Sequence, residues 1–255
     1  MGNMKKALVT RAKNIGDITA VSHPILKQYA KTCGADFLII NEDKINIGSF
    51  HYEILQCYEL FETYDRILVI DSDVLITPSC PDLFDVVPYD CIGTIYEDKF
   101  ARAKTRKYLI KKVQEEWGSV GWESGYINTG VFLASKVHRD IFKHQKDKVW
   151  LRKDEGFDDI YLGYKIHEHK FKVFELPYKF NHMSMFSELG RNWLKSYIIH
   201  YAGRGFTGKK SRAEQMQLDL QILQQVFHPF LLNFYYIPQR LRLLAIGILN
   251  FSRGN

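Results

Sequence analysis

The sequence has little of the covalent or metal-binding chemistry that holds very small folds together. Its 255 residues include four cysteines, and no two of them form a Cys-x-x-Cys pair. This spacing excludes zinc ribbons and thioredoxin-like redox motifs. A chain of this length buries roughly three quarters of its unfolded surface, so its core needs no disulfides. We therefore expect a cytoplasmic protein with four reduced thiols, which are Cys33, Cys57, Cys80 and Cys91.

Long uninterrupted apolar runs are also missing. The first apolar run, residues 7–9, is too short for the core of a secretory signal. The longest apolar region, residues 226–251, is interrupted by histidine, proline and arginine, whereas a transmembrane helix needs about 20 apolar residues in succession. We expect this mixed apolar and basic stretch to pack on its own domain. Peripheral contact with a membrane surface and a homodimer contact are the alternatives.

No strong excess of one charge is present. The chain has 35 basic and 29 acidic residues, a formal net charge of +6. No nucleic-acid-binding module is recognisable, so we expect no nucleic-acid partner. With 46% hydrophobic and 25% charged residues, the composition is that of a soluble globular protein rather than a disordered or collagen-like chain. The length allows one large domain or two small ones.

What the chain does contain is an alternation of strand and helix patterns in its first 75 residues. Short apolar segments predict strands, and apolar residues at helical spacing predict helices. The predicted order is strand 6–10, a helix from Ser22 to Gly34, strand 36–40, helix 50–64 and strand 66–70. The third strand is apolar on both faces, so we expect it at the centre of a covered parallel sheet. This is a βαβαβ half of a doubly wound α/β sheet.

Beyond residue 75 the pattern is mixed. We predict strands at 91–95, 131–135, 171–176 and 197–201, and helices at 136–150, 158–168 and 212–227. Residues 99–125 are charged and aromatic without clean periodicity, which we interpret as a lid or an excursion from the core. There is no internal repeat or low-complexity linker. We therefore expect one domain over residues 1–210, followed by a helical appendage over residues 211–255.

Two carboxylates, Asp71 and Asp73, follow the third predicted strand. In extended backbone, residues two positions apart point to the same side. The carboxyl end of a strand is where open α/β sheets bind ligands. Two anions held this close repel each other unless a cation lies between them, and oxygen ligands suit Mg²⁺ or Mn²⁺ bound together with phosphate. A metal–phosphate site is favoured here, and a solvated turn or a helix N-cap is the alternative.

With its surroundings, this motif resembles the metal-binding Asp-x-Asp of nucleotide-sugar-dependent glycosyltransferases of the GT-A fold, and most closely the family 8, glycogenin-like group. The resemblance implies an α/β fold with a Rossmann-like mixed, mainly parallel central sheet, flanked by helices in a single domain. One pair departs from the family pattern, because the usual Asp-Gln reads Asp158-Asp159 here. The segments that carry the resemblance are Tyr64–Asp73, Tyr126–Phe132, Asp158–Leu162, Leu176–Asn181 and Ile199–Gly203 with Lys209.

The resemblance also implies a metal site and a nucleotide site. Asp71, Asp73 and His200 would bind one divalent ion, Mn²⁺ or Mg²⁺, which bridges the two phosphates of a nucleoside diphosphate. Ser72 and Gly203 belong to the same two segments and would lie against the nucleotide. A lone histidine is more often structural than a metal ligand, but the His-x-x-Gly segment after a strand favours a ligand at His200.

Four further residues receive roles in sugar transfer from the same resemblance. Lys209 would place a positive charge on the leaving diphosphate. Asn128 and Asp159 would hydrogen-bond hydroxyl groups of the sugar, although turns and helix caps also use such residues. Asp158 competes with Asp159 for the acidic role. The resemblance favours a reaction that retains the configuration at the anomeric carbon.

Strand ends suggest where a nucleoside would bind. Thr10 and Arg11 end the first predicted strand and Asn41 follows the second, so their side chains face the same crevice in a parallel sheet. The family resemblance favours a UDP-sugar as donor over a GDP-sugar. It also implies a glycan or another hydroxyl compound as acceptor.

Three other functions compete with a transferase. Residues 203–210 nearly match a P-loop, but Lys210 replaces the magnesium-binding hydroxyl and only about 45 residues follow. A haloacid-dehalogenase-like phosphatase also uses Asp-x-Asp, with the first aspartate as nucleophile, but there the pair follows the first strand. A non-catalytic nucleotide-sugar-binding protein would keep the same fold without turnover.

Overall fold

A computed structural model describes residues 4–152, 156–187, 190–203, 206 and 211–225, and beyond these residues 232, 234, 235, 237 and 241. It contains two compact units. Unit 1 comprises residues 1–14, 26–71 and 81–176, and unit 2 comprises residues 15–25, 72–80 and 177–255. The chain therefore passes from unit 1 to unit 2 directly after Asp71. The domain boundary expected at residue 210 stays a prediction.

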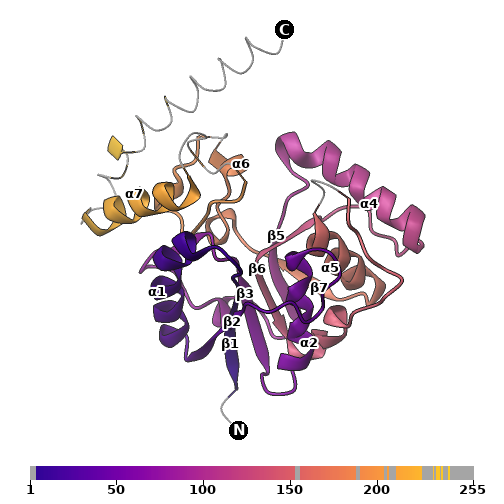
Figure 1. Ribbon diagram of the computed structural model, residues 1–255. Coiled ribbons are helices and arrows are strands. Elements are labelled where there is room, and N and C mark those ends of the chain that lie inside the picture. The colour runs from indigo at the N-terminus through magenta and orange to yellow at the C-terminus, as the bar shows by residue number, and fades with distance from the viewer. Residues whose placement is uncertain are drawn as a thin grey trace. The chain divides into compact units, whose positions relative to one another are not determined.

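Unit 1 is built on a six-stranded sheet in the order β2-β1-β3-β6-β5-β7 (Figure 1). β1 pairs in parallel with β2 and with β3, as the βαβαβ pattern predicts. β6 runs antiparallel to β3 and β5, and β5 pairs in parallel with β7, so the sheet is mixed but mainly parallel. The strands are β1 (Lys6–Arg11), β2 (Ala35–Ile40), β3 (Arg66–Ile70), β5 (Cys91–Tyr96), β6 (Ile127–Ser135) and β7 (Lys172–Glu175).

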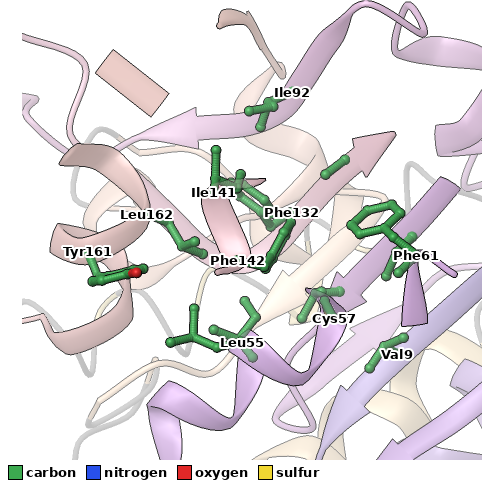
Figure 2. Packing of buried hydrophobic residues seen from close by; sticks show 14 of the residues in the cluster. Val9, Leu55, Cys57, Phe61, Ile92, Phe132, Ile141, Phe142, Tyr161 and Leu162 are labelled. Carbon is green, nitrogen blue, oxygen red and sulfur yellow. The ribbon is translucent and has the colours of Figure 1, made fainter. Parts of the chain in front are cut away.

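The centre of this sheet is buried on both faces. β3 and β6 are buried along their whole length, which agrees with the apolar run predicted for a central strand. One face packs against side chains from two 3-10 helices, η1 (Phe50–Gln56) and η3 (Lys136–Phe142), and from α5 (Phe157–Glu168). Figure 2 shows part of this cluster, including Val9, Leu55, Phe132, Phe142 and Leu162.

Two helices predicted in unit 1 are shorter than expected. In the segment 50–64, residues 52–55 are all buried, and the chain forms η1 followed only by the short α2 (Cys57–Leu60). The Glu53 carboxylate explains this local geometry, since it accepts hydrogen bonds from the backbone N–H groups of residues 44–46. The predicted helix 136–150 ends at Phe142, because residues 143–148 offer no apolar side chain at helical spacing.

Residues 99–125 form a helix that the sequence pattern does not predict. The short η2 (Phe100–Arg102) leads into α4 (Ala103–Trp117), which buries Leu109, Ile110 and Val113. Two further helices of unit 1 are the short α3 (Leu83–Val86), which the sequence pattern does not predict, and α5, which matches the predicted helix 158–168.

α1 (Gly16–Thr32) begins six residues before the predicted start at Ser22. The Ser22 hydroxyl does not cap the helix; it donates a hydrogen bond to the carbonyl of Ile18 one turn earlier. The predicted end is correct, because Gly34 follows α1 with a φ of +63°, a conformation that favours glycine.

Unit 2 contains a two-stranded sheet. β4 (Val74–Ile76) pairs antiparallel with β8 (Ile198–His200), and the sequence pattern predicts only the second of these strands. Val74 continues from the Asp-x-Asp motif, so its pairing with His200 brings that motif beside the predicted His-x-x-Gly segment. The other elements of the unit are η4 (Tyr178–Phe180), α6 (Ser184–Ser187), η5 (Trp193–Lys195) and α7 (Arg212–Gln225).

α7 agrees with the predicted helix 212–227 up to residue 225, and residues 226 and 227 lie outside the described residues. Most of the apolar stretch 226–251 also lies outside them, so its contact with a membrane or a second chain stays a prediction. Among the described residues, no helix is both long and apolar enough to cross a membrane.

Candidate functional site

In unit 1, charged side chains gather at the carboxyl ends of the central strands. Arg11 is the last residue of β1, Asp71 follows β3 directly, and Asp158 lies in the first turn of α5. One Arg11 nitrogen, Nη1, donates to Asp158 Oδ2 at 2.6 Å, and the other, Nη2, donates to Asp71 Oδ1 at 2.8 Å. Nη1 also donates to the backbone carbonyl of His51. Arg11 thus joins two of the predicted carboxylates.

This arrangement fixes the charge states of Arg11 and Asp158, whose side chains are each only 4% exposed. Burial lowers the pKa of Arg11, but the Asp158 and Asp71 carboxylates more than offset this and hold it above its ordinary value. Burial raises the pKa of Asp158, but Arg11 and His51 hold it below its ordinary value. Asp158 is therefore ionised and paired.

The neighbouring Asp159 has a different environment. Its Oδ1 accepts hydrogen bonds at 2.8 Å from the backbone N–H of Thr129 and lies 2.8 Å from the Thr129 hydroxyl, which is also 2.9 Å from Asp158 Oδ2. Burial and the negative charges of Asp158 and Glu97 raise the pKa of Asp159 to about 8. The structure thus shows different environments for two carboxyl groups that the sequence alone does not distinguish.

Asn128 lies at the start of β6, next to Thr129, and its amide is held by Glu97. Asn128 Nδ2 donates to Glu97 Oε1 at 2.7 Å, and Asn128 Oδ1 accepts from the backbone N–H of Gly130. Burial raises the pKa of Glu97, but Arg106 and Arg102 hold it below its ordinary value through contacts of 2.6 and 2.9 Å. Sequence reasoning missed Glu97 and its two arginines. The only signal in the sequence was an acid close after a predicted strand, since its arginine partners become apparent only in the folded chain.

Unit 2 places two further polar side chains beside Asp73. His200 Nε2 lies 3.3 Å from Asp73 Oδ1, and Arg212 Nη1 lies 2.8 Å from Asp73 Oδ2. Burial raises the pKa of Asp73, but His200 and Arg212 hold it below its ordinary value. Arg212, the first residue of α7, was not among the predicted site residues.

His200 is oriented by a hydrogen bond on its other nitrogen. His200 Nδ1 lies 2.8 Å from Asn181 Oδ1, an acceptor, so Nδ1 carries the hydrogen. Nε2 is then the nitrogen left to bind a metal ion, and a fixed tautomer of this kind is typical of metal-binding histidines. Asn181, part of the predicted Leu-Pro…Asn segment, therefore supports the assignment of His200.

Asp71, Asp73 and His200 form a group that could hold a metal ion. Asp71 is separated from Asp73 by one residue of chain, and one ligand atom from each of the three side chains lies within 4.8 Å of the others. Two carboxylates and one imidazole are ligands that Mn²⁺ and Mg²⁺ accept, with positions left for phosphate oxygens. The chemistry of the donor set thus fits the predicted ion.

The other predicted residues are placed as follows. Thr10 is buried within β1, and Ser72 is buried with its hydroxyl 3.5 Å from His23 Nε2. Asn41 follows β2 and is exposed, and no hydrogen bond is found from its side chain to the Arg11 group. Gly203 has a φ of +68°, and its carbonyl accepts from Arg212 Nη2 at 3.1 Å. Lys209 lies outside the described residues.

Comparisons with models of protein families and with curated proteins found no match. Comparison with solved structures did. A glycosyltransferase involved in glycosylation of the major capsid of PBCV-1 has 15% sequence identity and a TM-score of 0.55, over 85% of this chain and 99% of that chain. The galactosyltransferase LgtC, in complex with donor and acceptor sugar analogues, has 13% identity and a TM-score of 0.55, over 87% and 96% of the two chains.

These likenesses extend over nearly the whole of both solved chains, at sequence identities that establish the fold alone. Both solved structures carry the mixed α/β architecture found here. The predicted fold class is therefore confirmed, and the chain has the GT-A fold of the glycosyltransferases that it resembles.

Proposed function

We propose that this protein is a metal-dependent glycosyltransferase that moves a sugar from a nucleoside-diphosphate sugar to a glycan or another hydroxyl acceptor. The observation that carries the proposal is the group of Asp71, Asp73 and His200 in a chain with the GT-A fold. In a solvated turn, Asp73 would be exposed to water, whereas here it is buried beside a buried histidine of fixed tautomer. Such a pair is expected at a site that binds a divalent cation.

Asp71, Asp73 and His200 would hold Mn²⁺ or Mg²⁺, and the ion would supply a Lewis acid for the leaving diphosphate. Arg11 holds Asp71 in place through the 2.8 Å contact, and Asn181 holds His200. We assign Ser72, Gly203 and Lys209 to the diphosphate side, and Thr10, Arg11 and Asn41 to the nucleoside side. A UDP-sugar donor and retention of configuration follow from the family resemblance and are part of the proposal.

Asn128, Asp158 and Asp159 would bind or position the sugar. All three lie at the strand-end edge of unit 1, at the starts of β6 and α5. Glu97 fixes the Asn128 amide through the 2.7 Å hydrogen bond, so that its orientation is set before a ligand binds. Such preorganised hydrogen bonding is what sugar transfer requires.

Binding of nucleotide and metal tests the proposal. We expect UDP or GDP to raise the melting temperature of the protein when Mn²⁺ or Mg²⁺ is present, and to have little effect with a chelator. Asp73→Asn should lose this shift. The exposed Asp140→Asn, in η3, is the matched control and should keep it.

Each other outcome has a defined meaning. If neither nucleotide shifts the melting temperature with metal present, the proposal fails. Release of phosphate from a generic phosphomonoester without an acceptor would instead identify a phosphatase. A metal-dependent shift without hydrolysis of any nucleotide-sugar would identify a binding protein that has kept the fold.

A further inference from the structure

Two carboxyl groups share a single hydroxyl in unit 1. Thr129 Oγ1 lies 2.9 Å from Asp158 Oδ2 and 2.8 Å from Asp159 Oδ1, both within hydrogen-bond distance. A hydroxyl has one proton and can donate it to only one of them. If both carboxyl groups were ionised, one contact would place a negative oxygen against the lone pairs of the hydroxyl. These distances therefore call for a second proton among the three oxygens.

The surroundings assign this proton to Asp159. Asp158 has the Arg11 guanidinium at 2.6 Å, which stabilises the ionised carboxylate. Within the part of the chain that the structure describes, no lysine or arginine hydrogen-bonds to Asp159, whose other contact is the Thr129 backbone N–H. The raised pKa of Asp159, caused by burial and by the carboxylates of Asp158 and Glu97, agrees with this assignment.

Charged and titratable groups from several elements act on the pair. Most of these groups carry a negative charge or none, and the positively charged ones contact other carboxylates. They are Asp158 on α5, Tyr126 just before β6, Glu97 after β5, Arg106 on α4 in its ion pair with Glu97, Arg11 on β1 and His51 on η1 in their contacts with Asp158. Arg106 also attracts Asp159, but the net effect of burial and of these charges disfavours a second negative charge on Asp159.

We propose that the Asp158–Asp159 pair holds one proton at neutral pH, carried by Asp159 and donated to Thr129, whose own hydroxyl proton is donated to Asp158. Its role in regulation rests on the proposed function. With the proton in place, Asp159 is a neutral acid that can donate to a sugar hydroxyl as well as accept from one. Without it, a second anion stands at the edge of the sheet where a diphosphate sugar would bind, and transfer slows as the pH rises.

Protein stability reports the proton without any assay of transfer. A carboxyl group that keeps its proton in the folded state and loses it on unfolding favours the folded state at low pH, and this contribution is lost as the pH rises toward the folded-state pKa. Asp159→Asn keeps a neutral side chain of the same shape and cannot titrate. We expect the folding equilibrium constant of the wild type, relative to Asp159→Asn, to fall about tenfold for each pH unit between pH 5 and pH 7.

The matched control is Asp140→Asn, the same substitution at an exposed position of the same unit. A wild-type to Asp159→Asn ratio that stays constant with pH, or rises with pH, overturns the assignment. Infrared difference spectra of the wild type between pH 6 and pH 9 give a second test, which does not depend on the folding of any variant. The band of a protonated carboxylic acid must be present at pH 6 and lost at pH 9.

The activity measurement separates this inference from the proposed function. For transfer or for slow hydrolysis of a nucleotide-sugar, we expect the wild-type rate to fall above about pH 8, and the Asp159→Asn profile to lack this fall whatever its level. A profile of the variant that falls in the same way contradicts the regulatory role. If no nucleotide-sugar is turned over at any pH, the proposed function fails, while the stability measurements still decide where the proton is held.

Discussion

A few charged residues at the strand ends have a large influence on the free energy of unfolding. Arg11 and Asp158 form a buried ion pair at 2.6 Å, and such pairs are costly to break on one side only, because the remaining charge stays in a medium that solvates it poorly. Arg11 keeps a second partner in Asp71, and this reduces the cost of losing the first.

Asp158→Asn should therefore destabilise the folded protein by roughly 3 kcal/mol, the low end for a broken buried pair. Chemical denaturation at neutral pH measures this. Lys44 and Glu42 are 4.0 Å apart and exposed, so Glu42→Gln is the control, expected to change the free energy of unfolding by less than about 1 kcal/mol. Equal effects of the two substitutions would argue against a buried pair that stabilises unit 1.

Asn181 allows a second test at this scale, since it positions His200 without belonging to the expected metal ligands. Asn181→Ala removes the acceptor for His200 Nδ1 and frees the ring to change tautomer. We expect the affinity for Mn²⁺ to fall about 10- to 100-fold, the range usual for such partners. Calorimetric titration with the metal measures this affinity. An unchanged affinity would show that Asn181 does not position His200 for metal binding.

At the scale of elements, the segment between α4 and β6 packs closely against both α4 and α5. A Cβ added at Gly163 on α5 would lie 2.5 Å from the ring of the buried Trp122, closer than real contacts allow. Trp122 belongs to the cluster under α4 with Leu109 and Val113. The glycine is thus needed for approach of the indole rather than for its own backbone freedom.

Gly163→Ala should destabilise the protein by about 1–3 kcal/mol, the usual cost of overpacking, despite the better helix propensity of alanine. Gly16→Ala at the start of α1 is the matched control, because nothing lies within 4 Å of the added Cβ. Thermal or chemical unfolding of the two variants compares them. A neutral or stabilising Gly163→Ala would show that Trp122 moves aside at little cost.

The elements also show which parts of the fold could be predicted from sequence. Strands with apolar residues on both faces, such as β3, and helices with regular spacing, such as α5, were located to within a residue or so. η1 was not, because its residues 52–55 are all buried and Glu53 serves the backbone of a neighbouring loop. α4 was missed because its charged residues conceal a short apolar stripe.

The candidate site was predictable only where a motif carried it. Asp71 and Asp73 were found from their place after a buried strand. Glu97 and Arg212 were not, since a lone acid or arginine has no recognisable spacing, and their partners are distant in sequence or appear only once the chain has folded. The division between Asp158 and Asp159 depends on Arg11, a residue of another strand, and no local pattern encodes it.

At the scale of the whole molecule, stability toward acid should depend on His182 in unit 2. Its ring nitrogens lie 2.6 Å from the Ser196 hydroxyl and 2.9 Å from the Ser187 hydroxyl, and burial, with a smaller effect of Arg191, lowers its pKa to about 3. The unfolded chain takes up a proton near pH 6.5, where the folded protein does not. The stability contributed by neutral His182 is thus present above pH 6.5 and is lost as the pH falls toward 3.

Chemical denaturation at pH 7, 5 and 4 measures this loss. Compared with His182→Gln, which cannot take up a proton, the wild type should lose stability steadily below pH 6.5. Gln28→Ala, at an exposed position of α1 that carries no titratable group, is the control and should follow the wild type through the same range. A wild type and His182→Gln that respond equally to acid would show that His182 becomes charged without unfolding.

The central claim at this scale is that a chain with the GT-A fold and an Asp71, Asp73 and His200 group turns over nucleotide-sugars. Incubation with a panel of UDP- and GDP-sugars, with Mn²⁺, with Mg²⁺ and with a chelator, measures it directly as release of the nucleoside diphosphate. We predict release from at least one donor, dependent on the metal and lost in Asp73→Asn. Release that persists with the chelator, or none from any donor with metal present, would contradict the account.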